Sequence, residues 1–528
     1  MLSFYRTFFL FIPFLITVST GSHAQKPVAE HARAIITPLL MKQSIDYLAS
    51  DSMKGRETPS AGLDSSGAFI ARQFKSFGLL PLNGSYFQDL LFCQFSLDSN
   101  NFLSVVNDLQ TLNFILEKDF VPYDISGSKS AEGKIVFAGY GITAPEYDYD
   151  DYKDIDVKGH IVVVLRQEPG QIDFTQKKFK GIELTHYAGL KEKQKMAQDH
   201  GAAALLVMSE PLNHETLNPK GFIWPAPTEL RRKNGRPIGF CGSPEERIPM
   251  VLIGESVINE LFGKVDTVRV IQQRIEKNMQ PNSFIIPGKT LAMNVSLTGT
   301  PVGGRNVIAF LEGSDPGLKS EAVIIGGHYD HLGYLREHQT GTDYIYNGAD
   351  DNASGTSGVL AAARAFGSMD EKPKRSIIFM AFAGEEKGLL GSATYMKQPL
   401  WPVNKTVAML NLDMIGRNYP DSLEVIGAKQ NPGIWRIIRR QNRRVGFILA
   451  ESKGKRMNEG SDHYNFFRNG IPAVYFFTGF HQDYHKVTDN PDRINSEKAA
   501  RVARLAFLTA WSIANNSAWF KIKKLDED

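Results

Sequence analysis

The chain has 528 residues, of which 42% are hydrophobic and 22% are charged, a composition typical of globular proteins. Its length indicates more than one domain. The 60 basic and 57 acidic residues give a formal net charge of +3, and we see no block of like charge long enough for a footprint on nucleic acid or an anionic membrane. A polyanionic substrate is therefore not expected.

The first 24 residues are predicted to be a secretory signal peptide. Arg6 supplies a positive charge, residues 8–18 form an apolar run, and Ser22 and Ala24 place small side chains where a signal peptidase cleaves. The alternative is an uncleaved anchor, but the run is too short to span a bilayer comfortably. Cleavage would leave Gln25 first. We expect a secreted protein, periplasmic in a Gram-negative bacterium and otherwise extracellular, with no membrane contact after cleavage.

Two helices are predicted in the segment 25–125. Apolar positions within 39–48 follow a helical pattern, and a second amphipathic helix is expected over 66–77, where apolar residues recur at steps of three and four. Gly78 lies where a helix C-cap is expected. A loop at 52–59 separates the two helices.

A distinct block spans residues 126–285. It contains short apolar runs typical of buried strands and one helix that leads into such a run. The expected strands are 134–139, 161–165, 205–208 and 248–253, and the helix is 190–200. The stretch 224–237, rich in Pro and Arg, is interpreted as a surface excursion.

The chain has two cysteines, Cys93 and Cys241, which lie far apart in the sequence. They lack the spacing of a cysteine zinc site, so any metal must be held by His, Asp and Glu. A disulfide between them stays open, because sequence alone does not bring the two Cα atoms within reach.

The segment 286–528 alternates short β-rich runs with helices. The predicted strands are 306–310, 322–326, 376–382, 406–412, 423–426 and 472–477, and the predicted helices are 356–368, 389–396, 432–443, 464–469 and 496–514. This alternation predicts an α/β fold, a mostly parallel (mixed) sheet flanked by helices on both faces.

Side chains capable of binding metal follow these strands. Five separate segments bring His, Asp or Glu to one rim of the predicted sheet, where ligands bind in open α/β folds. A buried cluster of carboxylates repels itself unless cations neutralise it. Imidazoles together with carboxylates form a ligand set that suits zinc. The segments are GHYDH at 327–331, GADDNASG at 348–355, AGEE at 383–386, DMIG at 413–416 and YH at 484–485.

These strings resemble the signature set of the di-zinc aminopeptidase family, which also includes glutamate carboxypeptidases and transferrin-receptor ectodomains. Five motifs occur in the order of the family, each after the expected strand. The block 126–285 resembles the protease-associated domain that many members carry as an insertion. The resemblance implies a peptidase domain of the zinc-exopeptidase (phosphorylase/hydrolase-like) three-layer fold, formed by 25–125 and 286–528.

The resemblance also implies a role for each matching residue. Two Zn²⁺ ions would be bound, with Asp350 as the shared ligand and a cis peptide bond between Asp350 and Asp351. Asp330 would accept the second imidazole N–H of the first histidine. The implied metal ligands are His328 and Asp413 for one ion, Glu386 and His485 for the other, and Asp350 between them.

Two further residues receive catalytic roles from the resemblance. Glu385 would be the general base that takes a proton from the attacking water and passes it to the leaving amine. Tyr484 would polarise the scissile carbonyl. Four nearby histidines, His331, His338, His463 and His481, receive no role, and the run 475–477 is expected to lie in the core.

The expected function is hydrolysis of N-terminal residues from peptides. One alternative is a carboxypeptidase or dipeptidase at the same metal site, which would need a cationic pocket for a terminal carboxylate; Arg417 or Arg456 could supply it. Another alternative is a non-catalytic, receptor-like ectodomain. Retention of all five implied ligands and of Glu385 argues against the receptor.

Overall fold

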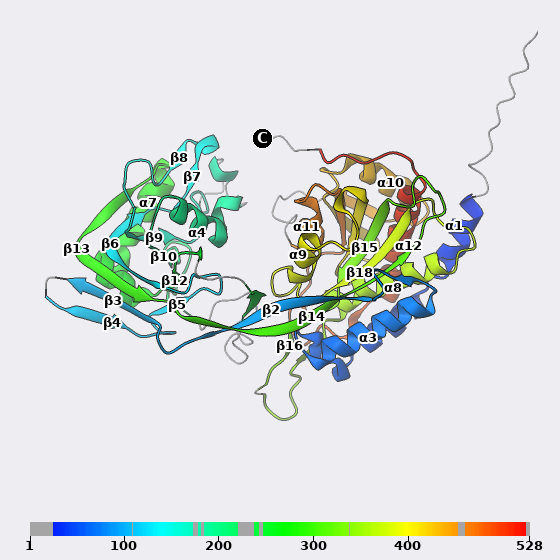
Figure 1. Cartoon of the computed structure of the whole chain (residues 1–528), viewed down its shortest axis with the longest axis horizontal. Helices are drawn as coiled ribbons and strands as arrows, with labels where there is room; N and C mark the ends of the chain where they lie inside the picture. Colours follow the sequence, from blue (N-terminus) through cyan, green and yellow to red (C-terminus); the bar gives the residue numbers. More distant parts are fainter. Residues whose placement is uncertain are drawn as a thin grey trace, which may run out of the picture.

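The computed structural model describes residues 25–107, 109–172, 178–180, 184–219, 237–241, 246–336, 338–451 and 460–523. The predicted signal peptide, most of the predicted surface excursion and Arg456 lie outside these ranges. Two bodies of unequal size are connected by a long pair of strands (Figure 1). Within the described ranges, we find no helix whose length and apolar character would let it cross a bilayer.

The larger body is built on a mixed sheet of ten strands, in the order β11-β2-β14-β18-β15-β19-β22-β20-β21, with β1 on β14. Its centre is parallel, as predicted: β15 pairs in parallel with β18 and β19, and β19 with β22. The flanking β14 and β20 run antiparallel to the centre. The strands are β1 (Leu80–Pro81), β2 (Phe87–Leu97), β11 (Ile238–Phe240), β14 (Leu297–Leu311), β15 (Ala322–His328), β18 (Ser376–Phe382), β19 (Thr406–Leu412), β20 (Ser422–Ile426), β21 (Ile448–Glu451) and β22 (Ala473–Phe477).

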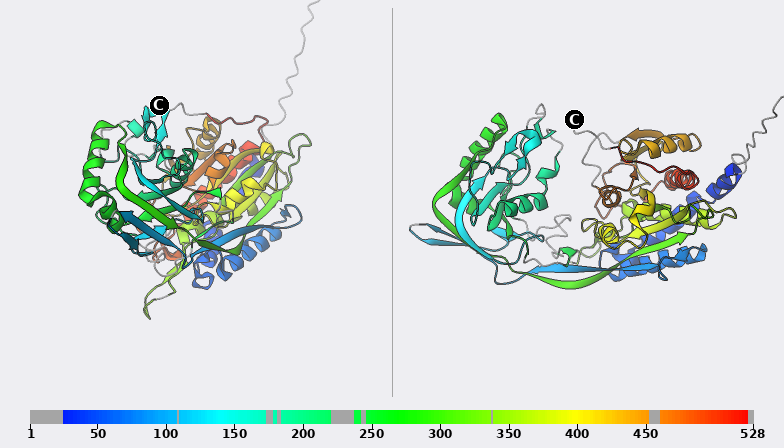
Figure 2. Two further views of the ribbon diagram at one scale, coloured as in Figure 1. Left: turned by 60° about the vertical axis from the view of Figure 1, so that its left-hand side comes forward. Right: turned by 45° about the horizontal axis from the view of Figure 1, so that its top comes forward.

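Helices cover both faces of this sheet, so the body has three layers (Figure 2). Every residue of β15 is buried, and alternate residues enter different cores: Val323 and Ile325 pack in one, Ile324 in the other. Such two-sided burial explains the continuous apolar run of the strand. The helices are α1 (Gln25–Ala34), α2 (Pro38–Leu48), α3 (Ala61–Ser76), α8 (Gly355–Gly367), α9 (Leu390–Lys397), α10 (Pro432–Asn442), α11 (His463–Phe467) and α12 (Ser496–Ala514).

The helix predicted at 66–77 begins five residues earlier than expected, at Ala61. The side chain of Ser60 accepts a hydrogen bond from the backbone N–H of Leu63 at 3.1 Å and so caps the first turn. The first turn itself carries few apolar residues, which is why the hydrophobic period revealed only the later part of the helix.

The smaller body contains a sheet of eight strands in the order β4-β3-β13-β6-β9-β10-β12-β5. This sheet extends beyond the block 126–285 predicted from the sequence. Three of its strands, β3, β4 and β5, precede residue 126, and most of β13 follows residue 285. The strands are β3 (Phe102–Asn107), β4 (Thr111–Phe114), β5 (Phe120–Pro122), β6 (Ser130–Ala138), β9 (Ile161–Leu165), β10 (Ala204–Met208), β12 (Met250–Ile253) and β13 (Ser283–Asn294), with helices α4 (Leu190–Asp199), α6 (Glu255–Phe262) and α7 (Val265–Asn278).

The connection between the bodies is an antiparallel ribbon of β2 and β14. Eleven residue pairs run from Leu97 opposite Leu297 to Phe87 opposite Val307. Strand β2 leads into the smaller sheet and β14 leads back, so the smaller body is an insertion within the larger one (Figure 1). The sequence analysis placed no strand at 87–97.

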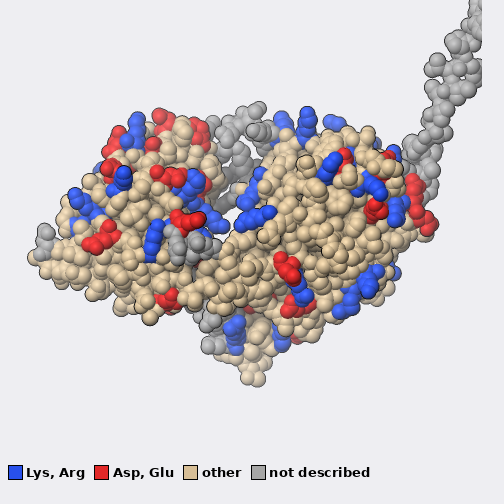
Figure 3. All heavy atoms as spheres, in the orientation of Figure 1, with Lys and Arg blue, Asp and Glu red and all other residues tan. Residues whose placement is uncertain are grey.

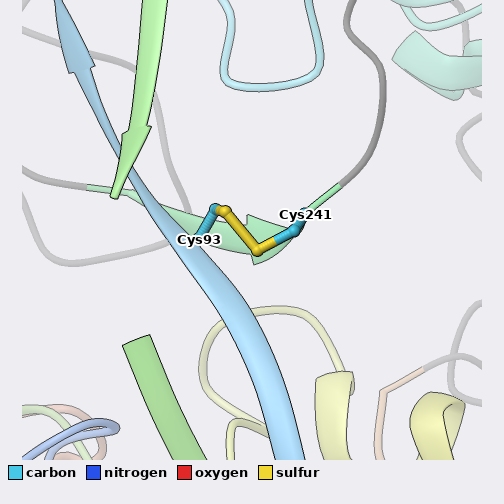
Figure 4. Close-up of a disulfide and its surroundings, with 2 residues drawn as sticks. All are labelled: Cys93 and Cys241. Atoms are coloured by element: carbon cyan, nitrogen blue, oxygen red, sulfur yellow. A yellow bond between two sulfur atoms is a disulfide. The ribbon is translucent and has the colours of Figure 1, made fainter. Parts of the chain in front are cut away.

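A disulfide joins Cys93 of β2 to Cys241, with 4.9 Å between the Cα atoms (Figure 4). Strand β11 pairs antiparallel with β2 and sets Gly239 opposite Cys93, which brings Cys241 within reach. The pairing that the sequence left open is therefore present, and it fastens a segment of the insertion to the edge of the larger sheet.

Replacing Cys93 and Cys241 together by serine should lower the unfolding free energy by about 2–4 kcal/mol, because the bond closes a long loop in the unfolded chain. The two cysteines are separated by 148 residues in the sequence. Thermal unfolding with and without reductant measures the effect. Reductant should shift the melting temperature of the parent protein but not that of the double variant; an equal shift in both would contradict the assignment.

Candidate active site

The five predicted segments meet at the carboxyl ends of the central parallel strands. His328 ends β15, Glu385 and Glu386 follow β18, and Asp413 follows β19. The loop before α8 and the segment after β22 complete the cluster. Segments that are far apart in the sequence therefore lie together at one rim of the sheet.

A first group of possible metal ligands surrounds the Nε2 atom of His328. This atom lies 3.3 Å from Oδ1 of Asp351 and 3.3 Å from Oδ1 of Asp413. All three side chains are buried, and their ligand atoms lie close enough to hold one ion.

A second group surrounds the other oxygen of Asp351. Nε2 of His485 lies 3.1 Å from Oδ2 of Asp351 and 3.2 Å from Oε2 of Glu386. His331, which received no role from the sequence, places Nδ1 at 2.7 Å from Oε1 of Glu386 and 3.8 Å from Oδ2 of Asp351. His331 lies close enough to hold one ion together with the two carboxylates, and His485 approaches the same two carboxylates at 3.1 and 3.2 Å.

The shared carboxylate is Asp351, not the predicted Asp350. Each oxygen of Asp351 faces one of the two groups. Asp350 points elsewhere: its Oδ1 accepts a hydrogen bond from the N–H of Gly416 at 2.7 Å, and its Oδ2 lies 3.3 Å from Nε2 of His481. The cis peptide bond is displaced in the same way and joins Asp351 to Asn352.

The loop is held in this arrangement by buried hydrogen bonds. The Asp489 carboxylate accepts the N–H groups of Asp350 and Asp351 at 3.0–3.1 Å. On the other side, the Asn352 amide donates to the carbonyl of Leu412 at 3.0 Å and accepts from the N–H of Gly355 at 2.9 Å. These contacts determine which of two adjacent aspartates faces the cluster, and none of them can be read from the spacing of the motif.

The charges of the cluster are strongly coupled. Burial opposes the charged form of His328, but Glu385 and Asp413 outweigh it and hold its pKa well above the ordinary value. Burial also opposes the charged form of His485, yet Glu386 and Asp351 raise its pKa to about 11. The imidazoles are thus drawn toward the cationic form by an excess of carboxylates.

The carboxylates divide into two kinds. Burial raises the pKa of Glu386, but His485 and then His331 lower it to about 2. Burial raises the pKa of Asp413, and His328 offsets this only in part. For Glu385, burial followed by the repulsion of Glu386 and Asp413 exceeds the attraction of His328, so its pKa lies well above the ordinary value.

This donor set fits divalent cations. Oδ1 of Asp413 is buried and accepts no hydrogen bond from any described residue, although it faces the centre of the first group. Buried polar atoms of this kind are costly unless a ligand satisfies them. Imidazole nitrogen and carboxylate oxygen are ligands that zinc accepts.

Asp330 acts differently from the prediction. The closest partner of His328 Nδ1 is the backbone carbonyl of Asp330 at 3.2 Å, whereas the carboxylate lies 3.6 Å away. The carboxylate instead accepts the backbone N–H of Glu385 at 3.1 Å and the hydroxyl of Thr58 at 3.1 Å. Asp330 therefore orients His328 through its carbonyl and fixes the backbone of Glu385 through its side chain.

Sequence reasoning gave no role to two residues that support the cluster. Arg56 is fully buried and donates to the carbonyls of Tyr329 at 2.8 Å and of Gly348 at 2.9 Å, which ties two ligand-bearing loops together. Ser461 donates its hydroxyl to Oδ2 of Asp413 at 2.7 Å. Arg56 lies in the loop predicted at 52–59, and nothing in the sequence shows that this arginine is buried.

A cavity of about 240 Å³ opens beside the cluster. Its wall is apolar on the side away from the carboxylates, where Tyr475 and Phe477 contribute to the lining. The expectation that 475–477 lies in the core is confirmed, because all three residues are buried. Side chains alternate along a strand, so Phe476 packs in the main core, whereas Tyr475 and Phe477 belong to a smaller cluster that also forms the cavity wall. The other lining residues on this side are Met414, Ile426, Phe480 and Tyr484.

Tyr484 lies at the boundary between the cavity wall and the cluster. Its ring stacks on that of His485 with centroids 3.8 Å apart and contacts Phe480 at 4.8 Å. Burial and then the carboxylates, Asp351 foremost, raise the pKa of its phenol, so the hydroxyl stays protonated and able to donate a hydrogen bond.

Arg417 does not provide a free cation. Its Nη2 lies 2.6 Å from Oδ2 of Asp483, and its Nη1 lies 3.8 Å from Oδ1 of Asp489. Asp483 also accepts the Thr488 hydroxyl at 2.7 Å. The guanidinium is therefore committed to two carboxylates that hold the ligand-bearing loops.

Comparison with known proteins finds matches to a peptidase family and to an inserted PA domain. The profile of peptidase family M28 matches residues 306–510, and that of the PA domain matches residues 125–261. The chain resembles the aminopeptidase YwaD of Bacillus subtilis (strain 168), with 24% identity over 392 residues, which are 71% of this chain and 68% of that protein. It is 30% identical over 260 residues to the uncharacterized protein YfbL of Escherichia coli (strain K12), covering 42% of this chain and 74% of that one.

Other relatives are matched over shorter parts. A protein of Arthroderma benhamiae named "Probable glutamate carboxypeptidase" is 29% identical over 202 residues, which span only 26% of its length and 36% of this chain. Among solved structures, an aminopeptidase from Aneurinibacillus sp. strain AM-1 has a TM-score of 0.57 at 20% identity, covering 94% of this chain and 98% of that chain. This likeness extends to the whole fold, including the insertion.

The assignment of the shared carboxylate can be tested with two matched variants. Asp351→Asn should lower the content of tightly bound metal below that of the parent protein, because it removes charge facing both groups. Asp350→Asn should keep the metal content of the parent, because its side chain bonds to Gly416 and not to the cluster. Metal analysis after dialysis measures this; loss of metal in Asp350→Asn alone would reverse the assignment.

Proposed function

This chain is a member of peptidase family M28, and from that premise we propose that it is a zinc-dependent aminopeptidase that uses two zinc ions. The observation that carries the proposal is the position of Asp351, whose two carboxylate oxygens face two separate groups of potential ligands. A carboxylate with this environment suits a pair of neighbouring cations.

The residues assigned to the first ion are His328, Asp351 and Asp413, and those assigned to the second are Asp351, Glu386 and His485. We assign His331 to orientation of Glu386, because its Nδ1 lies at hydrogen-bond distance from that carboxylate. When bound, zinc would polarise the scissile carbonyl and lower the pKa of the attacking water toward 7.

Glu385 is assigned the proton transfers. Its carboxylate lies 3.9 Å from Nε2 of His328, beside the first group, and its raised pKa gives it affinity for a proton. It would take a proton from the attacking water and deliver it to the amine that leaves. Asp330 keeps Glu385 in position through the hydrogen bond to its backbone.

The cavity explains how a substrate would be selected. Its apolar wall fits an uncharged side chain, while Glu385, Asp351 and Asp413 on the opposite side attract the positive α-amine of a peptide. The first residue of the peptide would thus occupy the cavity. Tyr484 could donate a hydrogen bond to the carbonyl as negative charge develops on it.

The structure favours an aminopeptidase over a carboxypeptidase. A terminal carboxylate requires a free cation near the reacting bond, but Arg417 is paired with Asp483 and Asp489. Arg456 lies outside the described residues. The receptor alternative is disfavoured because His328, Asp351, Glu386, Asp413, His485 and the base Glu385 are all present and gathered in one cluster.

We also propose that the protein works outside the cytoplasm. The N-terminal 24 residues have the features of a signal peptide. The Cys93–Cys241 bond supports the same proposal, because structural disulfides form mainly in oxidising compartments.

Replacing Glu385 by Gln should lower kcat by about 10²–10⁴-fold while both zinc ions stay bound, because the amide keeps the shape of the side chain but cannot accept the proton. Metal analysis together with steady-state kinetics checks both parts. Glu386→Gln serves as the comparison and should lose metal as well as activity. Normal turnover by the Glu385 variant would remove it from its assigned role.

Leucine p-nitroanilide should be hydrolysed much faster than aspartate p-nitroanilide, and an N-acetylated dipeptide should not be cleaved. Leucine is favoured because the cavity is apolar and because the nearby carboxylates repel an acidic side chain. The N-acetylated dipeptide is excluded because acetylation removes the positive amine. Release of nitroaniline and of free amino acids measures the three reactions. Cleavage of the blocked dipeptide alone would favour the carboxypeptidase.

A further inference from the structure

A large groove lies on the larger body between α10 and the segment 516–521. Its volume is about 910 Å³, within the range of ligand-binding sites. Three arginines of α10, the arginine that follows its last residue, and Lys521 line it, and no acidic residue belongs to the lining. The arginines are Arg436, Arg439, Arg440 and Arg443.

The positive charge of this arginine groove is not neutralised by the described part of the protein. The next arginine along the chain, Arg444, forms an ion pair with Glu30 at 3.2 Å. Two arginines of α12 are also paired, Arg501 with Asp421 at 2.7 Å and Arg504 with Glu497 at 3.1 Å. The four groove arginines form no ion pair with any described residue and are exposed. Lys and Arg side chains also line the upper edge of the larger body, where α10 lies (Figure 3).

The groove is preformed. Buried Arg375 donates to the carbonyls of Ile513 at 3.0 Å and Ser517 at 3.2 Å, which fixes the chain that forms one wall. Phe520 packs closely on α10, since a Cβ added at Gly433 would lie 2.7 Å from its ring. A rigid wall reduces the entropy lost when a ligand binds.

One aromatic side chain, that of Trp519, adds an apolar surface to the basic groove. Trp519 donates its indole N–H to Oε1 of Glu321 at 3.2 Å, so the ring is held in place, and yet 45% of the residue is exposed. A fixed, exposed indole beside guanidinium groups offers an apolar surface for a sugar ring next to donors for anionic substituents.

We infer that the arginine groove binds a short saccharide carrying several sulfate or phosphate groups. Arginine binds such groups through paired N–H donors, which favours it over lysine for discrete oxyanions. Arg436 and Arg443 are seven residues apart, or about 10 Å along the helix axis, close to the length of a disaccharide. The inference does not depend on the proposed peptidase activity.

Other anionic partners fit less well. Single-stranded nucleic acid is bound along a track of about four or more nucleotides, which is longer than this row of arginines. A membrane presents a broad surface, whereas the lining here is concave. An extended acidic peptide is usually bound through hydrogen bonds to the backbone of the protein. The backbone groups of α10 are already used in the hydrogen bonds of the helix.

The test uses the full-length protein and sucrose octasulfate as the probe, measured by isothermal titration calorimetry. Arg436→Gln combined with Arg440→Gln should weaken binding by roughly tenfold or more and flatten its dependence on salt. Arg72→Gln combined with Lys75→Gln, on α3, removes the same charge elsewhere and should leave the affinity unchanged. Equal affinity in the groove variant and the parent would overturn the inference.

Further probes distinguish the saccharide from anions in general. Trp519→Ala should weaken sucrose octasulfate several-fold but leave the binding of tripolyphosphate unchanged, since only the sugar contacts the indole. Unmodified sucrose should not bind. If tripolyphosphate or an oligonucleotide binds as tightly as sucrose octasulfate and Trp519→Ala affects them equally, the ligand is not a saccharide and the inference is wrong. Inositol hexakisphosphate then shows whether phosphate can replace sulfate.

Discussion

The larger body depends on one electrostatic constraint, the burial of several carboxylates around Asp351. Like charges so close together are unfavourable in a region with little water. Burial and the repulsion of neighbouring carboxylates accordingly raise the pKa values of Glu385 and Asp413. The fold tolerates the cluster because imidazoles face it and because Arg56 and Asp489 hold the surrounding loops. Buried carboxylates lower the stability of the folded protein, because they repel one another where little water screens them. Bound cations would relieve this repulsion, so the cluster is suited to bind them.

The positions of the ligands follow from the sheet. Parallel neighbours end at the same edge, so residues that follow β15, β18 and β19 are brought together although they are far apart in the sequence. The antiparallel strands at the flanks do not contribute ligands. The central strands are buried on both faces because helices pack against each face of the sheet there, whereas the flanking β14 and β20 have mixed exposure.

Much of this could be predicted from the sequence, and the failures have physical causes. Most strands and helices and the ligand-bearing segments of 306–514 were predicted closely, because each apolar run is continuous and is followed by polar residues. The short edge strand β21 was not predicted. The choice between Asp350 and Asp351 was wrong, since it depends on hydrogen bonds accepted by Asp489 and donated by Asn352, which no spacing reveals. The cavity wall was missed because alternation along β22 assigns Tyr475 and Phe476 to different surroundings.

The ribbon of β2 and β14 has a consequence for how such a chain can be shortened. Leu97 and Leu297 lie opposite each other in antiparallel register, so the inserted body occupies the place of a turn in an ordinary β-hairpin. A tight turn joining these two positions would close the ribbon and leave the larger sheet connected, with the loss of the edge strand β11 alone. Cuts at 126 and 285 would instead divide β13 and separate β3, β4 and β5 from their partners. Removal at the hairpin end would also leave Cys93 as a free thiol on the remaining strand.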